Sequence, residues 1–578
     1  MKNINDKYAL LIILIITSLI YAKGLSGNFL NYDDDILIVK NTSVHGINLT
    51  NLKTVLTPSP QRSYQPVRDI SYMLDYSLWE DNPFGYHLTN LLLYLVTGVV
   101  VFKVNKLLFP SKLISILTTL IFMIHPIHCE GVAWVSGRKE IISGLFLFLS
   151  LLYYLKSQKK SFYFNYITSL FFYIIAALGK ASVTFLPFAL LLIDYIKQKS
   201  FNLRTSILRI LSYLIISGII VYIYKDNKLI GFAAGYTQAF PLGQLISFIA
   251  NGIFFYFRNI LFPWNLAIHY SQTKVYPGLI ISEVFLFLII TFLLFKYKEK
   301  ECLLGWSWFW LSLIPTLAVH FYGIKFADRY IYLGIWGIAI IIAKLIEKIN
   351  STQFKKVIIY GIMIYFSLFT IQRVGVWQNN LTLWKDTVEK TNDGIAHLNY
   401  GIALLDNKKY SQSVGELLEA CASPMLRNVT LLASKSALDA ISRLEYETYY
   451  TYQQGEITST EYEQILKKLS AFYIETKKYN KAQEIFKNLL ILSPNNKNYL
   501  QDYASSCFMQ GNYTEALDFY LQAVKVKPND TNILNNLATC YYKLGKISYA
   551  KEIIAKILTL DPQNERAQKL TKLLNKEE

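Results

Sequence analysis

The eleven residues Asn31 to Asn41, NYDDDILIVKN, place three consecutive carboxylates about one turn beyond the first long apolar segment of the chain. Adjacent like charges repel one another, and a poorly solvated environment raises the pKa of such carboxyl groups. A carboxylate held in this way can take a proton from a hydroxyl group. Asp33, Asp34 and Asp35 are therefore candidates for a general base, although acidic runs also occur in ordinary solvated loops.

Further ionisable residues gather where apolar stretches begin or end. Such residues are costly near a membrane and usually mark a site. Arg and Lys can hold a phosphate leaving group through charge-assisted hydrogen bonds. A base together with such cations suits transfer of a group from a lipid-phosphate donor to an acceptor. The residues that we predict to bind the phosphate of this donor, or the acceptor, are Arg68, His87, His125, Arg138, Lys139, Glu140, Lys180 and Arg329. For Arg138, Lys139 and Lys180, the alternative is that they anchor helices at the membrane interface.

The segment HPIHCE offers His125, His128 and Glu130 at spacings that could contact a metal ion. Pro126 interrupts the helix that these ligands would need. The five cysteines show neither disulfide nor zinc spacing. The sequence therefore assigns no metal ligands and no certain cofactor, and a divalent metal ion remains an open alternative.

The composition shows which elements must position these residues. Of 578 residues, 53% are hydrophobic and 17% are charged, which is too apolar for one soluble core of this length. Apolar stretches of membrane-spanning length recur through the first 370 residues, so we predict a polytopic membrane protein. From Val374 onward 24 basic residues face 23 acidic ones, and the preceding part holds 34 against 17. The excess of basic residues in the first part of the chain is typical of short cytoplasmic loops between membrane spans, and does not indicate nucleic-acid binding.

Loop charge also predicts a topology. The first apolar stretch, YALLIILIITSLIYA, is interpreted as a retained signal anchor with its start in the cytoplasm. Short basic loops are expected in the cytoplasm. The basic loops later in the chain would lie outside if the stretch from Leu245 to Phe262 crossed the membrane. They lie in the cytoplasm if this stretch dips into the membrane or lies on its outer surface, which we therefore prefer. We therefore expect eleven spans within a domain of residues 1–373. A domain of residues 374–578 then lies outside the cytoplasm, on the same side as the acidic run.

The last third of the chain has a strong internal period. Pro494, Pro528 and Pro562 are 34 residues apart, as are Ala482, Ala516 and Ala550. A 34-residue period with small residues where two helices touch predicts tetratricopeptide repeats. Stacked repeats form a concave groove, so we predict a surface that binds a peptide or protein acceptor. The alternative is that the repeats only stabilise the membrane domain. The predicted fold class is all-α throughout.

Several motifs occur in a familiar order. They are GNFLNYDDDILIVKN, YQPVRDISYMLDYSLWEDNPFGYHLTNLLLYL, HPIHCEGVAWVSGRKEIISGLFLFLSLLYY, GKASVTFLPFALLLIDY, FADRYIYL and VWQNNLTLWKDTVEKTNDGIAHLNYG. Over nearly its whole length the chain resembles the transmembrane and tetratricopeptide-repeat O-mannosyltransferases and their prokaryotic relatives, within the GT-C glycosyltransferase superfamily.

The resemblance implies a glycosyltransferase that uses a polyprenyl- or dolichyl-phosphate sugar. It maps the family's acidic pair onto Asp33 and Asp34, which leaves Asp35 as an extra carboxylate and the identity of the base open. Lys180 is kept after Gly179, where relatives commonly have Ser-Lys. Gln65-Pro66-Val67 replaces a common Trp-Pro-Leu, a change that bears on acceptor contacts. The implied reaction is transfer to an acceptor hydroxyl, expected to be a protein Ser or Thr, with inversion at the sugar.

Two other classes compete with this hypothesis. A non-catalytic membrane scaffold would use the repeats to recruit a partner. A transporter or polymerase of lipid-linked glycans would carry charged residues through the middle of the bilayer, whereas here they gather near the outer ends of the predicted spans. The Lys- and Ile-rich sequence favours a prokaryotic inner membrane.

Overall fold

The computed structural model describes residues 5–59, 64–158, 162–197, 202–226, 252, 255–268, 270, 277–297, 299–320, 326–423 and 431–577. Within these residues the regular structure is entirely helical, which confirms the all-α prediction. Contacts divide the chain into two compact units, Met1–Ala396 and His397–Glu578.

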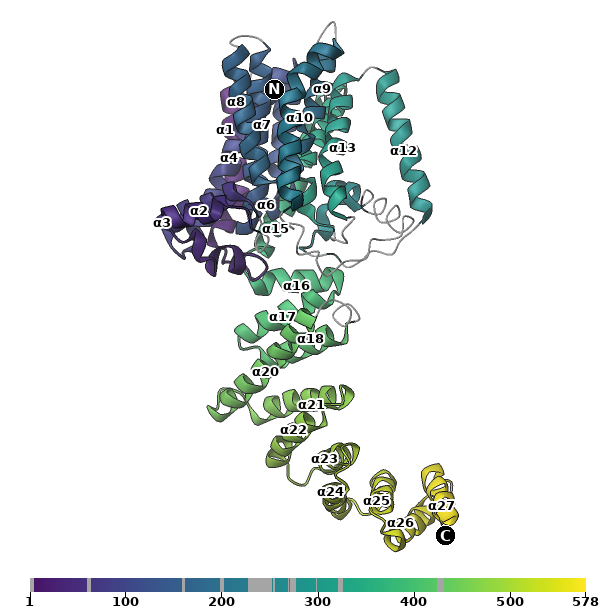
Figure 1. Ribbon diagram of the computed structural model, residues 1–578. Coiled ribbons are helices and arrows are strands. Elements are labelled where there is room, and N and C mark those ends of the chain that lie inside the picture. The colour runs from purple at the N-terminus through teal and green to yellow at the C-terminus, as the bar shows by residue number, and fades with distance from the viewer. Residues whose placement is uncertain are drawn as a thin grey trace. The chain divides into compact units, whose positions relative to one another are not determined.

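The first unit is a bundle of long helices (Figure 1). Its helices are α1 (Asp6–Tyr21), α2 (Leu49–Leu56), α3 (Pro66–Trp79), α4 (Pro83–Leu108), α5 (Lys112–Ile124), α6 (Cys129–Val132), α7 (Arg138–Ser157), α8 (Phe162–Gly179), α9 (Leu186–Lys197), α10 (Leu203–Asp226), α12 (Pro277–Lys296), α13 (Lys300–His320), α14 (Gly334–Glu347), α15 (Thr352–Val376) and α16 (Asn380–Thr391). Helix α17 (Gly394–Asp406) begins in this unit and continues into the second.

Six described helices are long and apolar enough to cross a membrane, and a seventh span is added if α5 and the following Pro126–Val132 segment count as one. Those two pieces meet at 48°, at the position where Pro126 removes a backbone donor. The protein is therefore a membrane protein. The expected number of eleven spans stays a prediction. Half of the stretch from Leu245 to Phe262, which is expected to dip into the membrane or to lie on its outer surface, is outside the described residues.

Local sequence explains how the helices that carry the site begin. Asn82 caps α4 by accepting a bond from the Phe84 amide, and Pro83 occupies the first helical position. Pro66 starts α3 in the same way. Figure 1 shows α2 and α3 lying across the end of the bundle at which α4 and α7 begin. The acidic run, α3 and the start of α7 are thereby brought to one end of the bundle.

The second unit is a series of stacked helix pairs. Its helices are α18 (Tyr410–Ala422), α20 (Leu431–Gln453), α21 (Ser459–Glu475), α22 (Tyr479–Leu492), α23 (Lys497–Met509), α24 (Tyr513–Val526), α25 (Thr531–Lys543), α26 (Ile547–Leu560) and α27 (Glu565–Glu577). Successive helices of this series pack against each other along the chain. Ala482, Ala516 and Ala550 are completely buried, as expected for small residues at helix contacts.

The repeat period also appears in the backbone. Gly511 and Gly545 have φ values of +84° and +70°, the left-handed region that glycine adopts without steric cost. Both end the first helix of a pair, so the 34-residue spacing of these glycines marks the turn at which each pair folds back.

Candidate functional site

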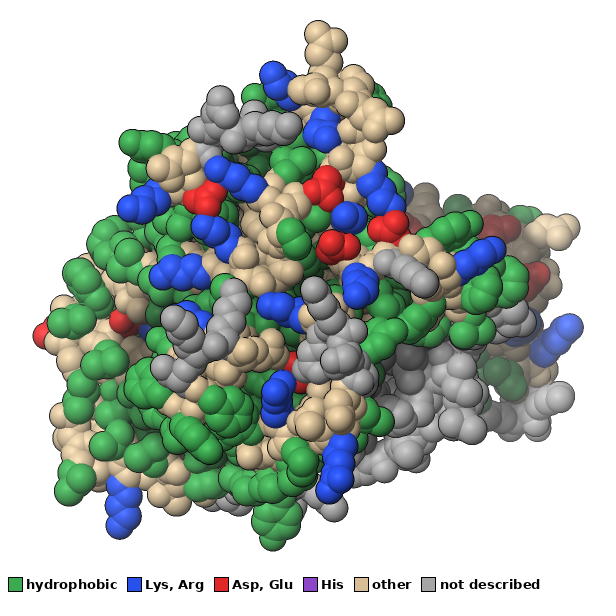
Figure 2. Space-filling view, turned by 90° about the horizontal axis from the view of Figure 1, so that it is seen from above, with side chains coloured by type: hydrophobic (Ala, Val, Ile, Leu, Met, Phe, Trp, Pro, Cys, Tyr) green, Lys and Arg blue, Asp and Glu red, His purple; other side chains and the backbone are tan. Residues whose placement is uncertain are grey.

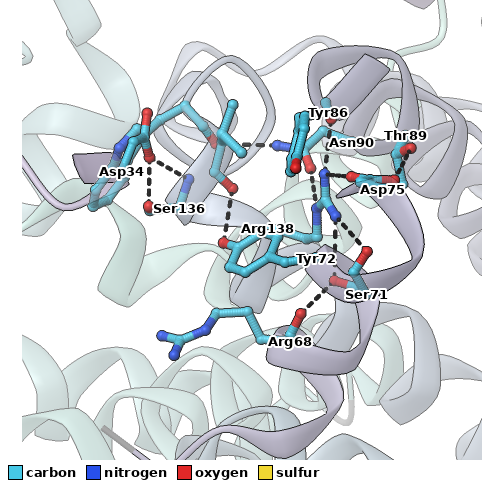
Figure 3. Close-up of polar contacts among 12 residues, drawn as sticks. Asp34, Arg68, Ser71, Tyr72, Asp75, Tyr86, Thr89, Asn90, Ser136 and Arg138 are labelled. Carbon is cyan, nitrogen blue, oxygen red and sulfur yellow. Dashed lines mark hydrogen bonds and ion pairs between the residues drawn. The ribbon is translucent and has the colours of Figure 1, made fainter. Parts of the chain in front are cut away.

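Asp34 is buried, and both oxygens of its carboxylate accept hydrogen bonds from the protein. Its carboxylate accepts hydrogen bonds from the amide of Leu30 at 2.9 Å, from the amide of Ser136 at 3.0 Å and from the Ser136 hydroxyl (Figure 3). Burial raises the pKa of Asp34 to about 7, and the bonds from Ser136 and Leu30 limit that rise. Asp34 therefore fastens the acidic loop to the turn that precedes α7.

The other two carboxylates have different surroundings. Asp35 pairs with Lys40 at 3.3 Å, and both side chains are well exposed. Asp33 is partly exposed and acts electrostatically on Arg68 and Lys139. The three successive aspartates thus differ in their surroundings. Asp33 lies near positive charges, Asp34 is buried, and Asp35 forms an ion pair at the surface. Asp33 combines access with nearby positive charge.

Arg138 lies at the centre of a buried polar cluster (Figure 3). The side chain is completely buried, and its guanidinium pairs with Asp75 of α3 at 2.5 Å. It also donates to the Asn90 side-chain oxygen at 2.6 Å, to the Tyr86 carbonyl at 2.9 Å and to Ser71. Contacts with protein groups thus surround Arg138, so its geometry suits holding α3, α4 and α7 together.

Trp134 forms the centre of a second group of residues. The indole is fully buried and stacks on Trp377 with ring centroids 5.8 Å apart. The ring of Tyr32 lies 5.5 Å away, and the cationic groups of Lys139 and Arg329 each lie 5.8 Å from the indole centroid. Residues from four separate segments therefore converge beside Asp33. Cations over an aromatic face are attracted by the ring quadrupole.

Two ion pairs complete this group. Arg329 pairs with Glu130 through its guanidinium, and its backbone amide donates to the same carboxylate at 2.7 Å. Lys180 bonds both oxygens of Glu140, at 2.6 and 2.7 Å. Both cations lie near the Tyr330 ring, at 5.2 Å for Arg329 and 5.4 Å for Lys180. The predicted residues Lys139, Glu140, Lys180 and Arg329 thus belong to one neighbourhood.

Arg68 joins this neighbourhood from α3. Its side chain is 2% exposed and bonds Asp69 at 2.6–2.7 Å and the Gln65 side chain at 2.7 Å. Burial lowers the pKa of Arg68, but Asp69, Tyr72 and Asp33 together raise it above its ordinary value. The Arg68 guanidinium is therefore held in place as a positive charge, and it interacts electrostatically with Asp33.

The predicted histidines have other surroundings. His87 is buried against Gly27, and neither ring nitrogen has a hydrogen-bond partner among the described residues. His125 bonds the Ile260 carbonyl at 3.0 Å and packs its ring 4.5 Å from Phe366. His128 bonds the Tyr94 hydroxyl at 2.7 Å. Within the described part of the chain, no three His, Cys, Asp or Glu residues gather as a metal site would require.

Some important contacts escape reasoning from the sequence. The sequence marks Glu130 only as a possible metal ligand, yet Glu130 pairs with Arg329. No sequence pattern assigns a role to Asp75, yet it is the carboxylate paired with Arg138. Trp134 and Ser136 were not assigned a role, although a tryptophan and a serine in a short polar loop between apolar helices are an available signal.

Gly137 lies where the turn at Ser136 packs closely against α6, so a substitution at this position tests that packing. A Cβ at this position would lie 2.1 Å from the Glu130 carbonyl oxygen and 3.0 Å from Gly131 Cα, both backbone atoms. We expect Gly137→Ala to separate the Ser136 turn from α6 and to lower the free energy of unfolding by about 1–3 kcal/mol. Thermal unfolding in detergent measures this change. Gly361→Ala is the matched control, because nothing lies within 4 Å of its Cβ. Equal unfolding temperatures for the two variants would contradict this packing.

Comparison with known proteins supports the resemblance seen in the motifs. The chain is 27% identical over 433 residues to "Protein O-mannosyl-transferase F38B6.6" of Caenorhabditis elegans, covering 69% of this chain and 60% of that protein. It is 35% identical over 168 residues to "Protein O-mannosyl-transferase TMTC3" of Homo sapiens, covering 27% of this chain and 18% of that protein. The chain thus spans less than two thirds of the length of these relatives.

The repeats are matched independently. Residues 473–534 and 507–574 match the tetratricopeptide repeat family. Among solved structures, the chain is similar to the tetratricopeptide repeat protein YrrB, with 13% identity over 33% of this chain and 97% of that one and a TM-score of 0.21. The chain is therefore similar in sequence to proteins named protein O-mannosyl-transferases and carries tetratricopeptide repeats in its last third, as its motifs predict.

Proposed function

We propose that this protein is a membrane glycosyltransferase that moves a sugar from a polyprenyl- or dolichyl-phosphate donor to a hydroxyl group of a protein Ser or Thr. The observation that carries the proposal is that a partly exposed carboxylate, Asp33, lies near the charges of Lys139 and Arg68. Lys139 and Arg329 both lie over the Trp134 ring at the same end of the bundle. The names of the relatives support the reaction class.

In the proposed reaction Asp33 takes the proton of the acceptor hydroxyl as its oxygen bonds to the anomeric carbon of the sugar. The bond between that carbon and the phosphate oxygen breaks, and the electron pair leaves with the lipid phosphate. Lys139 and Arg329 stabilise the released phosphate by charge-assisted hydrogen bonds. Direct displacement of this kind inverts the anomeric configuration. Asp34 and Arg138 position the loop and helices rather than touching the substrate.

The acceptor is proposed to enter through the repeats. The second unit contains a cavity of about 780 Å³ lined by α18, α20 and α21, with Leu418, Phe472 and Lys468 among its walls. Apolar and charged groups in one groove suit a peptide segment rather than a small anion. We further propose that the acidic loop and the repeats lie outside the cytoplasm of a prokaryotic inner membrane.

A panel of donors tests the function. Purified protein would be incubated with a Ser- and Thr-containing peptide and one radiolabelled donor at a time, either a polyprenyl-phosphate hexose from a panel that includes mannose, or GDP-mannose. We expect label in the peptide from the lipid-linked donor alone. Equal transfer from the nucleotide donor, or none from a panel of lipid-linked hexoses, would contradict the proposal.

A scaffold remains the second candidate, because the repeats alone would support it. It predicts peptide binding by the full chain with no transfer from any donor.

A further inference from the structure

A second pocket lies at the opposite end of the bundle from the acidic loop. The cavity has a volume of about 490 Å³ and is lined where α4 and α9 end and α13 begins. Its charged walls are three lysines and one glutamate, namely Lys106, Lys197, Lys300 and Glu301. The remaining walls are apolar and include Phe109, Ile193 and Leu304. The pocket therefore has more positive than negative side chains, and its remaining walls are apolar.

The surface around the pocket has the same character. Figure 2 views this end of the bundle and shows Lys and Arg side chains spread over it among fewer Asp and Glu side chains. Much of the acidic charge is already paired, since Asp6 bridges Lys106 and Lys112, and Glu347 holds Lys344 at 2.9 Å. Short loops rich in Lys at helix ends are typical of a membrane interface.

Helix capping explains only part of this arrangement. Lys197 donates to the Leu107 carbonyl at 2.9 Å, and Lys300 donates to the Ile196 carbonyl at 3.4 Å. Lysines commonly bond the last carbonyls of a helix. Capping does not require three lysines from three elements to border one open space of this volume. An ammonium group has three donors, so bonding one carbonyl leaves Lys300 able to hold an anion as well.

We propose that this pocket binds the headgroup of an anionic phospholipid. Lys106 is paired with Asp6, so Lys197 and Lys300 would hold the phosphate, while Phe109, Ile193 and Leu304 would contact the glycerol and the upper acyl chains. Basic pockets between membrane helices are suited to such headgroups, and each Lys near the surface contributes about 1 kcal/mol of attraction to anionic lipid. The site is separate from the proposed transfer site and does not depend on sugar transfer.

Native mass spectrometry of the full-length protein in detergent tests the proposal, with phosphatidylglycerol and phosphatidylcholine as probes. We expect phosphatidylglycerol to bind more tightly than phosphatidylcholine. Lys300→Gln should weaken phosphatidylglycerol binding about fivefold, and Lys197→Gln with Lys300→Gln about thirtyfold. Lys300 is exposed, and among the described residues its side chain makes one long bond, so its replacement should leave the protein folded.

The matched control is Lys103→Gln with Lys356→Gln, which removes the same charge from the same end of the bundle at exposed positions outside the pocket. We expect this variant to bind phosphatidylglycerol as the unaltered protein does. Equal weakening in both double variants, or equal binding of phosphatidylcholine, would overturn the proposal. Displacement of phosphatidylglycerol by millimolar inorganic phosphate would instead indicate a site for a free anion and would also overturn it.

Discussion

Replacing Asp33 with Asn is expected to lower kcat for sugar transfer by about 10²–10⁴-fold, the range that general base catalysis contributes. The carboxylate is partly exposed and lies in the field of Arg68 and Lys139, so its loss removes the proton acceptor without emptying a packed core. The unfolding temperature should therefore stay close to that of the unaltered protein. Initial rates with a saturating lipid-linked donor, together with thermal unfolding, measure both quantities.

The neighbouring carboxylates supply the comparison. Asp34→Asn removes a charge that accepts from Leu30 and Ser136, and each buried donor left unsatisfied costs about 1–3 kcal/mol. This variant should lose both stability and activity. Asp35→Asn removes only an exposed ion pair with Lys40, worth about 0–1 kcal/mol, and should keep full activity. Full activity in Asp33→Asn, or loss in Asp35→Asn, would contradict the assignment of the base.

The second large effect is expected at Arg329. Its guanidinium is held by Glu130 and lies over Trp134, the ring that Lys139 also approaches. Replacing Arg329 alone would leave Glu130 buried and unpaired, which typically costs about 3–5 kcal/mol. The informative variant is therefore Arg329→Gln with Glu130→Gln, which removes both charges together. We expect kcat to fall by about 10²–10³-fold, as for loss of one group that stabilises transition-state charge.

Kinetic constants separate this role from a structural one. If Arg329 stabilises the departing phosphate, kcat falls more than KM for the donor changes, because the contact strengthens as charge develops. Arg329→Lys keeps one charge and should recover part of the rate. A double variant that unfolds at the normal temperature and turns over normally would show that the pair has no part in transfer.

The sequence predicted the elements well because their signals are local. Long apolar segments, Pro at helix starts and the 34-residue spacing of Ala482, Ala516 and Ala550 each depend on neighbouring residues. Helical structure and the repeats followed from these patterns. The number of spans did not follow as firmly, because helices such as α9 and α14 are shorter than a full crossing.

The residue types of the candidate site can be read from the sequence, but their pairings cannot. Arg138 and Lys139 are adjacent and both basic, yet Arg138 turns into a cluster with Asp75 while Lys139 lies over Trp134. Both residues lie at the start of α7. Which of them faces α3 depends on packing between segments that are far apart in the chain. The same holds for Glu130 and Arg329, which are 199 residues apart.

Cysteine labelling in oriented vesicles tests the central claim, that the acidic loop acts on the face opposite the lysine-rich end. Four of the five native cysteines are buried, so replacing Cys421 with Ser leaves a quiet background. Single cysteines would then be placed at Asp35 and at Lys356 and treated with an impermeant maleimide. The account predicts labelling from outside the cytoplasm at position 35, with position 356 protected until the membrane is opened. Labelling of position 35 from the cytoplasmic side alone would contradict it.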